Sequence, residues 1–169
     1  VMALAPLRRF GINKIHMVSA QAISGAGYPG VASLDIVDNV IPYVSGDEDK
    51  LETETLRMLG KLDGEHVVWL NARTSAACNR VPVVDGHLVS VSVELADKPS
   101  FEAVIRAWES FRGSEPVPSL PSAPTQPVQY LYQHDRPQIR RDRNAGNGMT
   151  ASVGRLRECG ILGYKFSAL

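Results

Sequence analysis

The spacing of apolar residues predicts three helices along the chain. Residues 1–10 place apolar side chains about one helical turn apart, and Gly11 follows them as a typical helix end. A second helix is predicted over 47–60, where Ser45 would begin a capping box, and a third follows the cap Ser100. The apolar stripe of the third helix has the i, i+3, i+4, i+7 spacing of an amphipathic helix that packs on a core.

Alternating and β-branched runs between the helices predict strands. One is expected over 12–20, and two more over 76–83 and 87–95. Asp85-Gly86, between the last two, is a strong signal for a tight turn and predicts a β-hairpin. Three shorter runs near the C-terminus are also strand-like: 128–132, 149–156 and 161–166. This order of elements indicates an α+β domain in which helices pack on one face of a mostly antiparallel sheet.

Composition limits the classes of function that this domain can have. The 169 residues suffice for one domain with a sizeable core, and 18 basic residues balance 18 acidic ones. This balance and the lack of a long apolar run argue against a nucleic-acid or membrane partner. The basic cluster at 136–143 is interrupted by Asp142 and is expected to form ion pairs at a subunit contact. Four scattered histidines lack metal-ligand spacing, so no metal is expected, and two cysteines favour a reducing cytoplasm.

Arg80 and His87 are the first candidates for chemistry. If the predicted hairpin places them near adjacent strand ends, the arginine could grip a carboxylate and the imidazole could move protons near neutral pH. The same spacing also fits an arginine in an ion pair and a histidine that satisfies the backbone groups of a turn.

Other candidates each have an ordinary explanation as well. A glycine-rich loop beginning at Ser24-Gly25 could bring bare amides against an anionic or planar ligand, or be a simple loop. Lys50, near a helix start, could hold a phosphate or be a surface lysine. Cys78 and Cys159 are expected to be structural.

Several motifs occur in order along the chain. They are 21–30 (QAISGAGYPG), 38–43 (DNVIPY), 47–50 (DEDK), 79–87 (NRVPVVDGH) and 153–157 (VGRLR). Together they resemble the aspartate-semialdehyde dehydrogenases, in particular the fungal and archaeal branch. The resemblance covers essentially the whole chain and implies the α+β fold of a glyceraldehyde-3-phosphate-dehydrogenase-like C-terminal domain.

The resemblance also implies a reaction. Enzymes of this family reduce L-4-aspartyl phosphate to L-aspartate 4-semialdehyde with NADPH, on the route to lysine, threonine and methionine. A cysteine thiolate attacks the acyl phosphate, phosphate leaves and a thioester forms. For this chain the resemblance implies that His87 is the general acid/base, Gln21 orients the acyl group and Arg80 binds the α-carboxylate. It further implies that Lys50 contacts the phosphate.

Two more assignments follow from the resemblance. Ser24 and Gly25 are implied to lie beside the nicotinamide end of NADP. At the position of the family's amine-binding glutamate this chain has Asp47, with Glu48 next to it, and either carboxylate is a candidate.

Parts of the family's enzyme are expected to lie outside residues 1–169. The nucleophilic cysteine is expected a few residues before Val1, after a nucleotide-binding domain, and a closing helix is expected after Leu169. Neither Cys78 nor Cys159 matches that nucleophile. The chain is therefore expected to be a single catalytic and dimerisation domain that is inactive alone and forms a homodimer, with a tetramer left open.

Two other functions remain open at this point. The related N-acetyl-glutamyl-phosphate reductases share the architecture and the chemistry, although the motifs around Gln21 and Arg80 argue against them. A non-catalytic oligomerisation module would use the same polar residues only at its interface.

Overall fold

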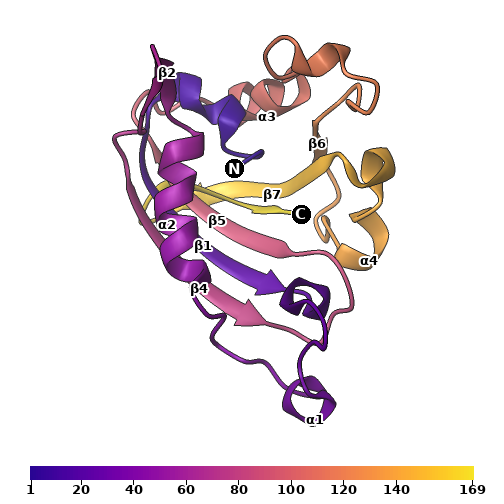
Figure 1. Ribbon diagram of the computed structural model, residues 1–169. Helices are drawn as coiled ribbons and strands as arrows, with labels where there is room; N and C mark the ends of the chain where they lie inside the picture. Colours follow the sequence, from indigo (N-terminus) through magenta and orange to yellow (C-terminus); the bar gives the residue numbers. More distant parts are fainter.

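A curved six-stranded sheet forms the centre of the computed structural model, which describes residues 1–169 (Figure 1). The strand order is β4-β1-β5-β8-β7-β6. Three of the five strand contacts are antiparallel, and β1–β4 and β6–β7 are parallel. The predicted mostly antiparallel sheet is thus confirmed. The strands are β1 Ile12–Gln21, β4 Arg73–Arg80, β5 Leu88–Leu95, β6 Val128–Leu131, β7 Ala151–Cys159 and β8 Gly163–Ala168.

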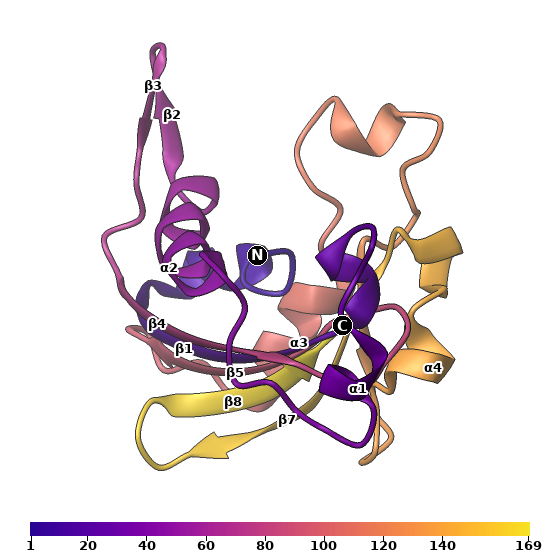
Figure 2. The same cartoon turned by 60° about the horizontal axis from the view of Figure 1, so that its bottom comes forward.

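The two longer helices and the N-terminal segment lie against one face of this sheet and leave the other face open (Figure 2). The longer ones are α2 Asp47–Met58 and α3 Phe101–Glu109, and the shorter ones are α1 Ser33–Ile36 and α4 Ile139–Asp142. Four 3-10 turns accompany them: η1 Ala5–Phe10, η2 Ile23–Ala26, η3 Val117–Ser119 and η4 Ala145–Gly148. The predicted helix over 1–10 is therefore a turn followed by a 3-10 helix. A small hairpin of β2 Lys61–Asp63 and β3 His66–Val68 was not expected.

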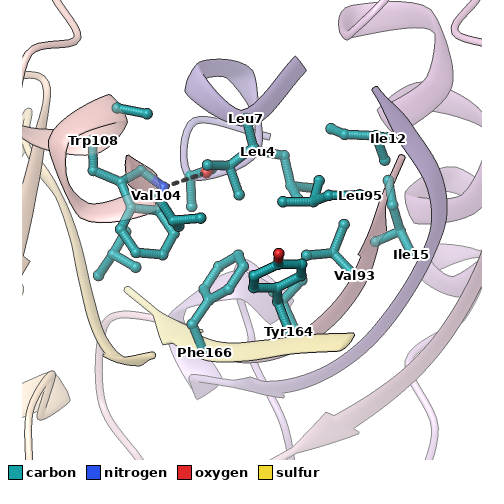
Figure 3. Packing of buried hydrophobic residues seen from close by; sticks show 14 of the residues in the cluster. Leu4, Leu7, Ile12, Ile15, Val93, Leu95, Val104, Trp108, Tyr164 and Phe166 are labelled. Carbon is teal, nitrogen blue, oxygen red and sulfur yellow. Dashed lines mark hydrogen bonds between the residues drawn. The ribbon is translucent and has the colours of Figure 1, made fainter. Parts of the chain in front are cut away.

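The core lies between the sheet, α3 and the N-terminal segment (Figure 3). Trp108 of α3 is fully buried, and its indole Nε1 donates to the carbonyl of Ala3 at 2.7 Å. The ring also packs edge-on against Phe166 of β8, with centroids 5.1 Å apart. A large aromatic at this junction ties the N-terminal segment to the sheet, and truncating such a side chain costs about 3–5 kcal/mol.

The two longer helices begin in different ways. In α3 the hydroxyl of Ser100 accepts from the backbone N–H of Ala103 at 3.2 Å, so the predicted cap is confirmed. The predicted capping box of α2 is wrong, because Gly46 is its N-cap residue and no side chain caps it.

Tertiary contacts explain the lost capping box. Glu48 accepts from the backbone N–H of Cys78 at 2.9 Å, and Glu52 accepts from that of Ala76 at 2.8 Å. Both donors belong to β4, an edge strand of the sheet, and no neighbouring strand pairs with it at Ala76 or Cys78. The carboxylates of α2 therefore satisfy the sheet edge instead of their own helix start.

The predicted hairpin between β4 and β5 is also wrong. β1 lies between these two strands, parallel to β4 and antiparallel to β5. The connection 81–87 crosses over the end of β1, and its carbonyls at Val83 and Val84 accept from the N–H groups of Ile23 and Ser24. The long β1 offers both strands a partner, which a local turn signal cannot reveal.

Candidate active site at one end of the sheet

β1 and β4 end, and β5 begins, at the same end of the sheet. Gln21 ends β1 and Arg80 ends β4, and the two are paired in the parallel register. His87 directly precedes β5, which runs antiparallel to β1, so His87 lies at the same end of the sheet as Gln21 and Arg80. Arg80 and His87 thus converge as predicted, but through the crossover connection and not through a hairpin.

The peptide groups of Ala22 join Arg80 to His87. Nη1 of Arg80 donates to the Ala22 carbonyl at 2.7 Å, and the Ala22 N–H donates to Nδ1 of His87 at 3.3 Å. Because Nδ1 accepts a hydrogen bond, we infer that the neutral imidazole carries its proton on Nε2. Nε2 is then the ring nitrogen that is available to a substrate.

Gly25 lies against both of these side chains. A Cβ added at Gly25 would lie 3.0 Å from Nη1 of Arg80 and 3.1 Å from Nε2 of His87. The absence of a side chain there allows the loop after β1 to approach the pair. Ser24 and Gly25 themselves are exposed.

Asp85 holds this loop to the turn that carries His87. Its Oδ1 accepts from the hydroxyl of Ser24 and from the N–H of Gly86, both at 3.0 Å. Its carbonyl accepts from Nη1 of Arg143 at 3.1 Å, just beyond α4. The chain therefore bends at Asp85 without the predicted hydrogen-bonded turn, and this bend fixes His87 beside η2 and does not close a hairpin.

Arg80 is a buried cation without a carboxylate partner. Its exposed fraction is 7%, and its side chain donates to a neutral carbonyl only. The chain has two salt bridges, Lys14–Glu94 and Arg136–Asp142, and neither involves Arg80. A buried guanidinium with no counter-charge favours an anionic ligand, because burying an unpaired charge is costly.

Two hollows of about 300 Å³ each meet at His87. One is lined mainly by apolar residues, among them Met17, Leu51 and Val91. The other is more polar and includes Asp142 and Arg143. Nε2 of His87, which has no hydrogen-bond partner in the chain, therefore lies beside two hollows that a ligand could enter.

The first turn of α2 lies beside β4 (Figure 1), and no hydrogen bond joins its candidates Asp47, Glu48 and Lys50 to Arg80 or His87. Asp47 and Lys50 are in the first turn of α2, and their side chains form no hydrogen bond. Glu48 is already bound to the N–H of Cys78. Of the two acids considered for the substrate amine, Asp47 is therefore the one with a free carboxylate.

Other site residues have partners within the chain. Gln21 is buried and its Nε2 donates to the hydroxyl of Ser19 at 3.3 Å. The main-chain groups of Ala22 and the carboxylate of Asp85 were not anticipated as parts of the site. Main-chain groups leave no signal in a sequence, and Asp85 was interpreted only as a hairpin residue.

No cluster of three His, Cys, Asp or Glu residues could hold a metal ion. None of the helices is both long and apolar enough to cross a membrane. Arg136, part of the basic cluster, pairs with Asp142 of its own chain.

The fold and the site define an α+β domain of the glyceraldehyde-3-phosphate-dehydrogenase-like C-terminal kind, with an arginine–histidine pair at the end of its sheet. Residues 4–168 match the model of the semialdehyde dehydrogenase dimerisation domain, and the chain belongs to this family.

Curated relatives agree with this assignment. An aspartate-semialdehyde dehydrogenase of Archaeoglobus fulgidus is 45% identical over 169 residues, which cover 100% of this chain and 48% of the relative. One of Cryptococcus neoformans is 44% identical over 178 residues, covering 100% of this chain and 49% of the relative. The resemblance to the archaeal and fungal branch is confirmed. The chain spans about half the length of these relatives.

A solved structure agrees as well. The aspartate-semialdehyde dehydrogenase of Candida albicans, crystallised with NADP, superposes with a TM-score of 0.84 at 38% identity. The match covers 98% of this chain and 48% of that one.

Proposed function

We propose that this chain is the substrate-binding and dimerisation domain of an NADP-dependent aspartate-semialdehyde dehydrogenase. The reaction would be the reduction of L-4-aspartyl phosphate to L-aspartate 4-semialdehyde. The observation that carries the proposal is the buried, carboxylate-free guanidinium of Arg80, joined through Ala22 to the ring of His87. The family membership of the chain supports the same conclusion.

Each site residue then has a role. The fork of Arg80 binds the substrate α-carboxylate, and Nε2 of His87 gives or takes a proton at the reacting acyl group. Gln21 orients that acyl group. Lys50 contacts the phosphate, and Asp47 binds the amine because Glu48 is committed to β4.

The nucleophile and the cofactor domain would come from the rest of the enzyme. Cys78 and Cys159 are buried, with exposed fractions of 1% and 8%, and neither lines the two hollows at His87. NADPH would supply the hydride, and the exposed Ser24 and Gly25 are the residues of this chain that would flank its nicotinamide.

A homodimer would use the open face of the sheet. Along β4, β5 and β8 this face presents small side chains, including Ala77, Ser90 and Ser167, which allow a second sheet to approach closely. The family name of the matched domain supports self-association through this domain. Sedimentation of the chain as monomer only would contradict it.

The test uses the longest natural protein that contains this chain, assayed for phosphate-dependent reduction of NADP by aspartate semialdehyde. Arg80→Lys should raise KM about tenfold or more, because lysine cannot bind a carboxylate bidentately. His87→Ala should lower kcat by about 10²–10⁴. Arg73→Lys, at the exposed far end of the same strand, is the matched control and should change neither constant.

The same assay separates the other functions. Preference for N-acetyl-glutamate semialdehyde would assign the chain to the related reductases. A His87→Ala enzyme of unchanged rate would show that the polar residues serve only an interface.

A further inference from the structure

Cationic side chains gather on the open face of the sheet, away from the Arg80–His87 site. Ser92 of β5 is paired with Lys165 of β8, and Lys165 with Arg157 of β7. Directly opposed residues of antiparallel strands point to the same face. The inward-pointing Val91 and Phe166, which belong to the core, alternate with this row and fix its side as the open face.

These residues surround a small hollow of about 110 Å³. Its polar lining consists of three cations and three hydroxyls: Arg155, Arg157, Lys165, Ser90, Ser92 and Ser167. A volume of this size corresponds to roughly three or four water molecules of about 30 Å³ each. It therefore has room for a tetrahedral oxyanion.

The three cations have no counter-charge in the chain. The two salt bridges are Lys14–Glu94 and Arg136–Asp142, so Arg155, Arg157 and Lys165 all lack a carboxylate partner. Three like charges around one hollow repel each other, and that repulsion falls when an anion occupies the space between them.

A β-bulge in β7 brings the arginines together. Gly154 pairs with Ser167 and Arg157 with Lys165, so β7 has one more residue than β8 across this interval. The extra residue turns Arg157 onto the open face, where a regular alternation from Gly154 would turn it inward. Arg155 has φ +59°, a backbone conformation that is strained for a residue with a side chain. Strain of this kind is typical of places where a side chain has a binding role.

The sheet of a second copy of this chain, packed on the open face, would offer the three cations no free carboxylate. The six strands contain two, Glu94 and Glu158. Glu94 is bound to Lys14 at 2.8 Å. Glu158 is paired with Tyr164, whose ring belongs to the core, so it lies on the other face. The strands of a second copy therefore offer no counter-charge, which favours a soluble anion.

We propose that Arg155, Arg157 and Lys165, with the hydroxyls of Ser90 and Ser167, form a binding site for a tetrahedral oxyanion of the phosphate class. The hydroxyls of Ser90 and Ser167, which have no side-chain partner in the chain, donate to its oxygens. If the open face also forms the proposed homodimer interface, the anion neutralises cations there and strengthens self-association. That consequence rests on the proposed function, whereas the site does not.

The experiment titrates inorganic phosphate into the ¹⁵N-labelled 169-residue chain, with chloride at equal ionic strength as the blank. Amide shifts should be centred on Gly154, Lys165 and Ser167 and should saturate. Arg157→Gln should weaken binding about tenfold, as expected for the loss of a charge-assisted contact. Lys165→Gln is the second variant, should Arg157→Gln fail to fold.

The matched control is Arg73→Gln, which removes the same charge from the exposed edge strand β4, outside the hollow. Its affinity for phosphate should stay within about twofold of the parent, since distant surface charges are screened by salt. An equal loss in this variant, or shifts confined to Gly25 and His87, would overturn the site and leave the proposed function standing. A sedimentation result would also overturn the site: Arg157→Gln weakens self-association while added phosphate has no effect on it. A second copy of the chain, and not an anion, would then fill the hollow.

Discussion

The backbone N–H of Ala22 donates to Nδ1 of His87 across 3.3 Å, and this bond determines which ring nitrogen faces the site. Ala22 is completely buried, so its N–H has no access to water as an alternative acceptor. The carbonyl of the same residue accepts from Arg80 at 2.7 Å. One residue without a functional side chain therefore orients both groups that we assign to the substrate.

Removing the N–H of Ala22 should release the imidazole of His87. Ala22→Pro deletes the donor, and the native φ of −66° already suits a proline. We expect the ¹⁵N shifts of His87 to change from a dominant Nε2–H tautomer to a mixture of the two tautomers. Ala22→Gly keeps the N–H and should keep the tautomer. An unchanged tautomer in a folded Ala22→Pro chain would show that the bond does not orient the ring.

A methyl group at position 25 should disturb Arg80 and His87 together. Gly25→Ala places a carbon 3.0 Å from Nη1 of Arg80 and 3.1 Å from Nε2 of His87, closer than side chains normally approach. In the complete enzyme we expect a higher KM and a lower kcat, each by about tenfold, which corresponds to about 1.4 kcal/mol. Gly160→Ala, where an added Cβ meets nothing within 4 Å, is the control for a change without contact. Equal kinetics in the two variants would contradict the steric role of Gly25.

The parts of the fold that the sequence predicted are those with a local cause. The stripe of α3 and its Ser100 cap, and the alternation of β1, depend on residues close to each other in the chain. The predicted hairpin is wrong because the partner shared by β4 and β5 is β1, whose last residue, Gln21, lies more than 50 residues before its register partner Arg80. The predicted convergence of Arg80 and His87 is nevertheless confirmed, because the hairpin and the crossover connection both bring these two residues to the same end of the sheet.

Within the site, side chains were predictable and main-chain groups were not. The hydrogen bonds made by the peptide groups of Ala22 leave no mark in the sequence, where Ala22 cannot be told from any other alanine. Glu48 illustrates the converse, because its local pattern suggested a cap while its carboxylate is used by the distant N–H of Cys78.

Replacing Glu48 should therefore destabilise the chain before it affects substrate binding. Glu48→Ala leaves the N–H of Cys78 without its acceptor at the sheet edge, which should cost about 1–3 kcal/mol in the free energy of unfolding. Urea denaturation measures this difference. Glu54→Ala, at an exposed position of the same helix without side-chain bonds, should cost under about 0.5 kcal/mol. A Glu48→Ala enzyme of normal stability with a raised KM would instead assign the substrate amine to Glu48 and not to Asp47.

Acid should destabilise α4, which packs beside the chain segment that carries His87, because Asp142 of α4 loses its charge. The hydrogen bond from Arg136 is the main reason that the pKa of the Asp142 carboxyl is lowered, and the N–H of Gln138 adds to it. A lowered folded pKa means that this stability is fully present above the unfolded value of about 4 and is lost as pH falls through the folded pKa. Because Asp142 is only 5% exposed, Asp142→Asn should cost about 3 kcal/mol at pH 7, and the deficit relative to the parent should shrink below pH 4.

Thermal unfolding of the parent and Asp142→Asn from pH 7 to pH 2.5 measures that deficit. Asp135→Asn is the control, since Asp135 is exposed and bonds only to the Gln138 amide group and should show little change. The effect should reach the site, because α4 packs on Gly86 through Ile139 and Arg143 bonds the carbonyl of Asp85. Loosening α4 therefore frees the turn that carries His87, and hydrogen exchange at Gly86 should quicken in Asp142→Asn at neutral pH. A constant deficit across the whole pH range would show that the carboxylate charge of Asp142 contributes nothing to stability.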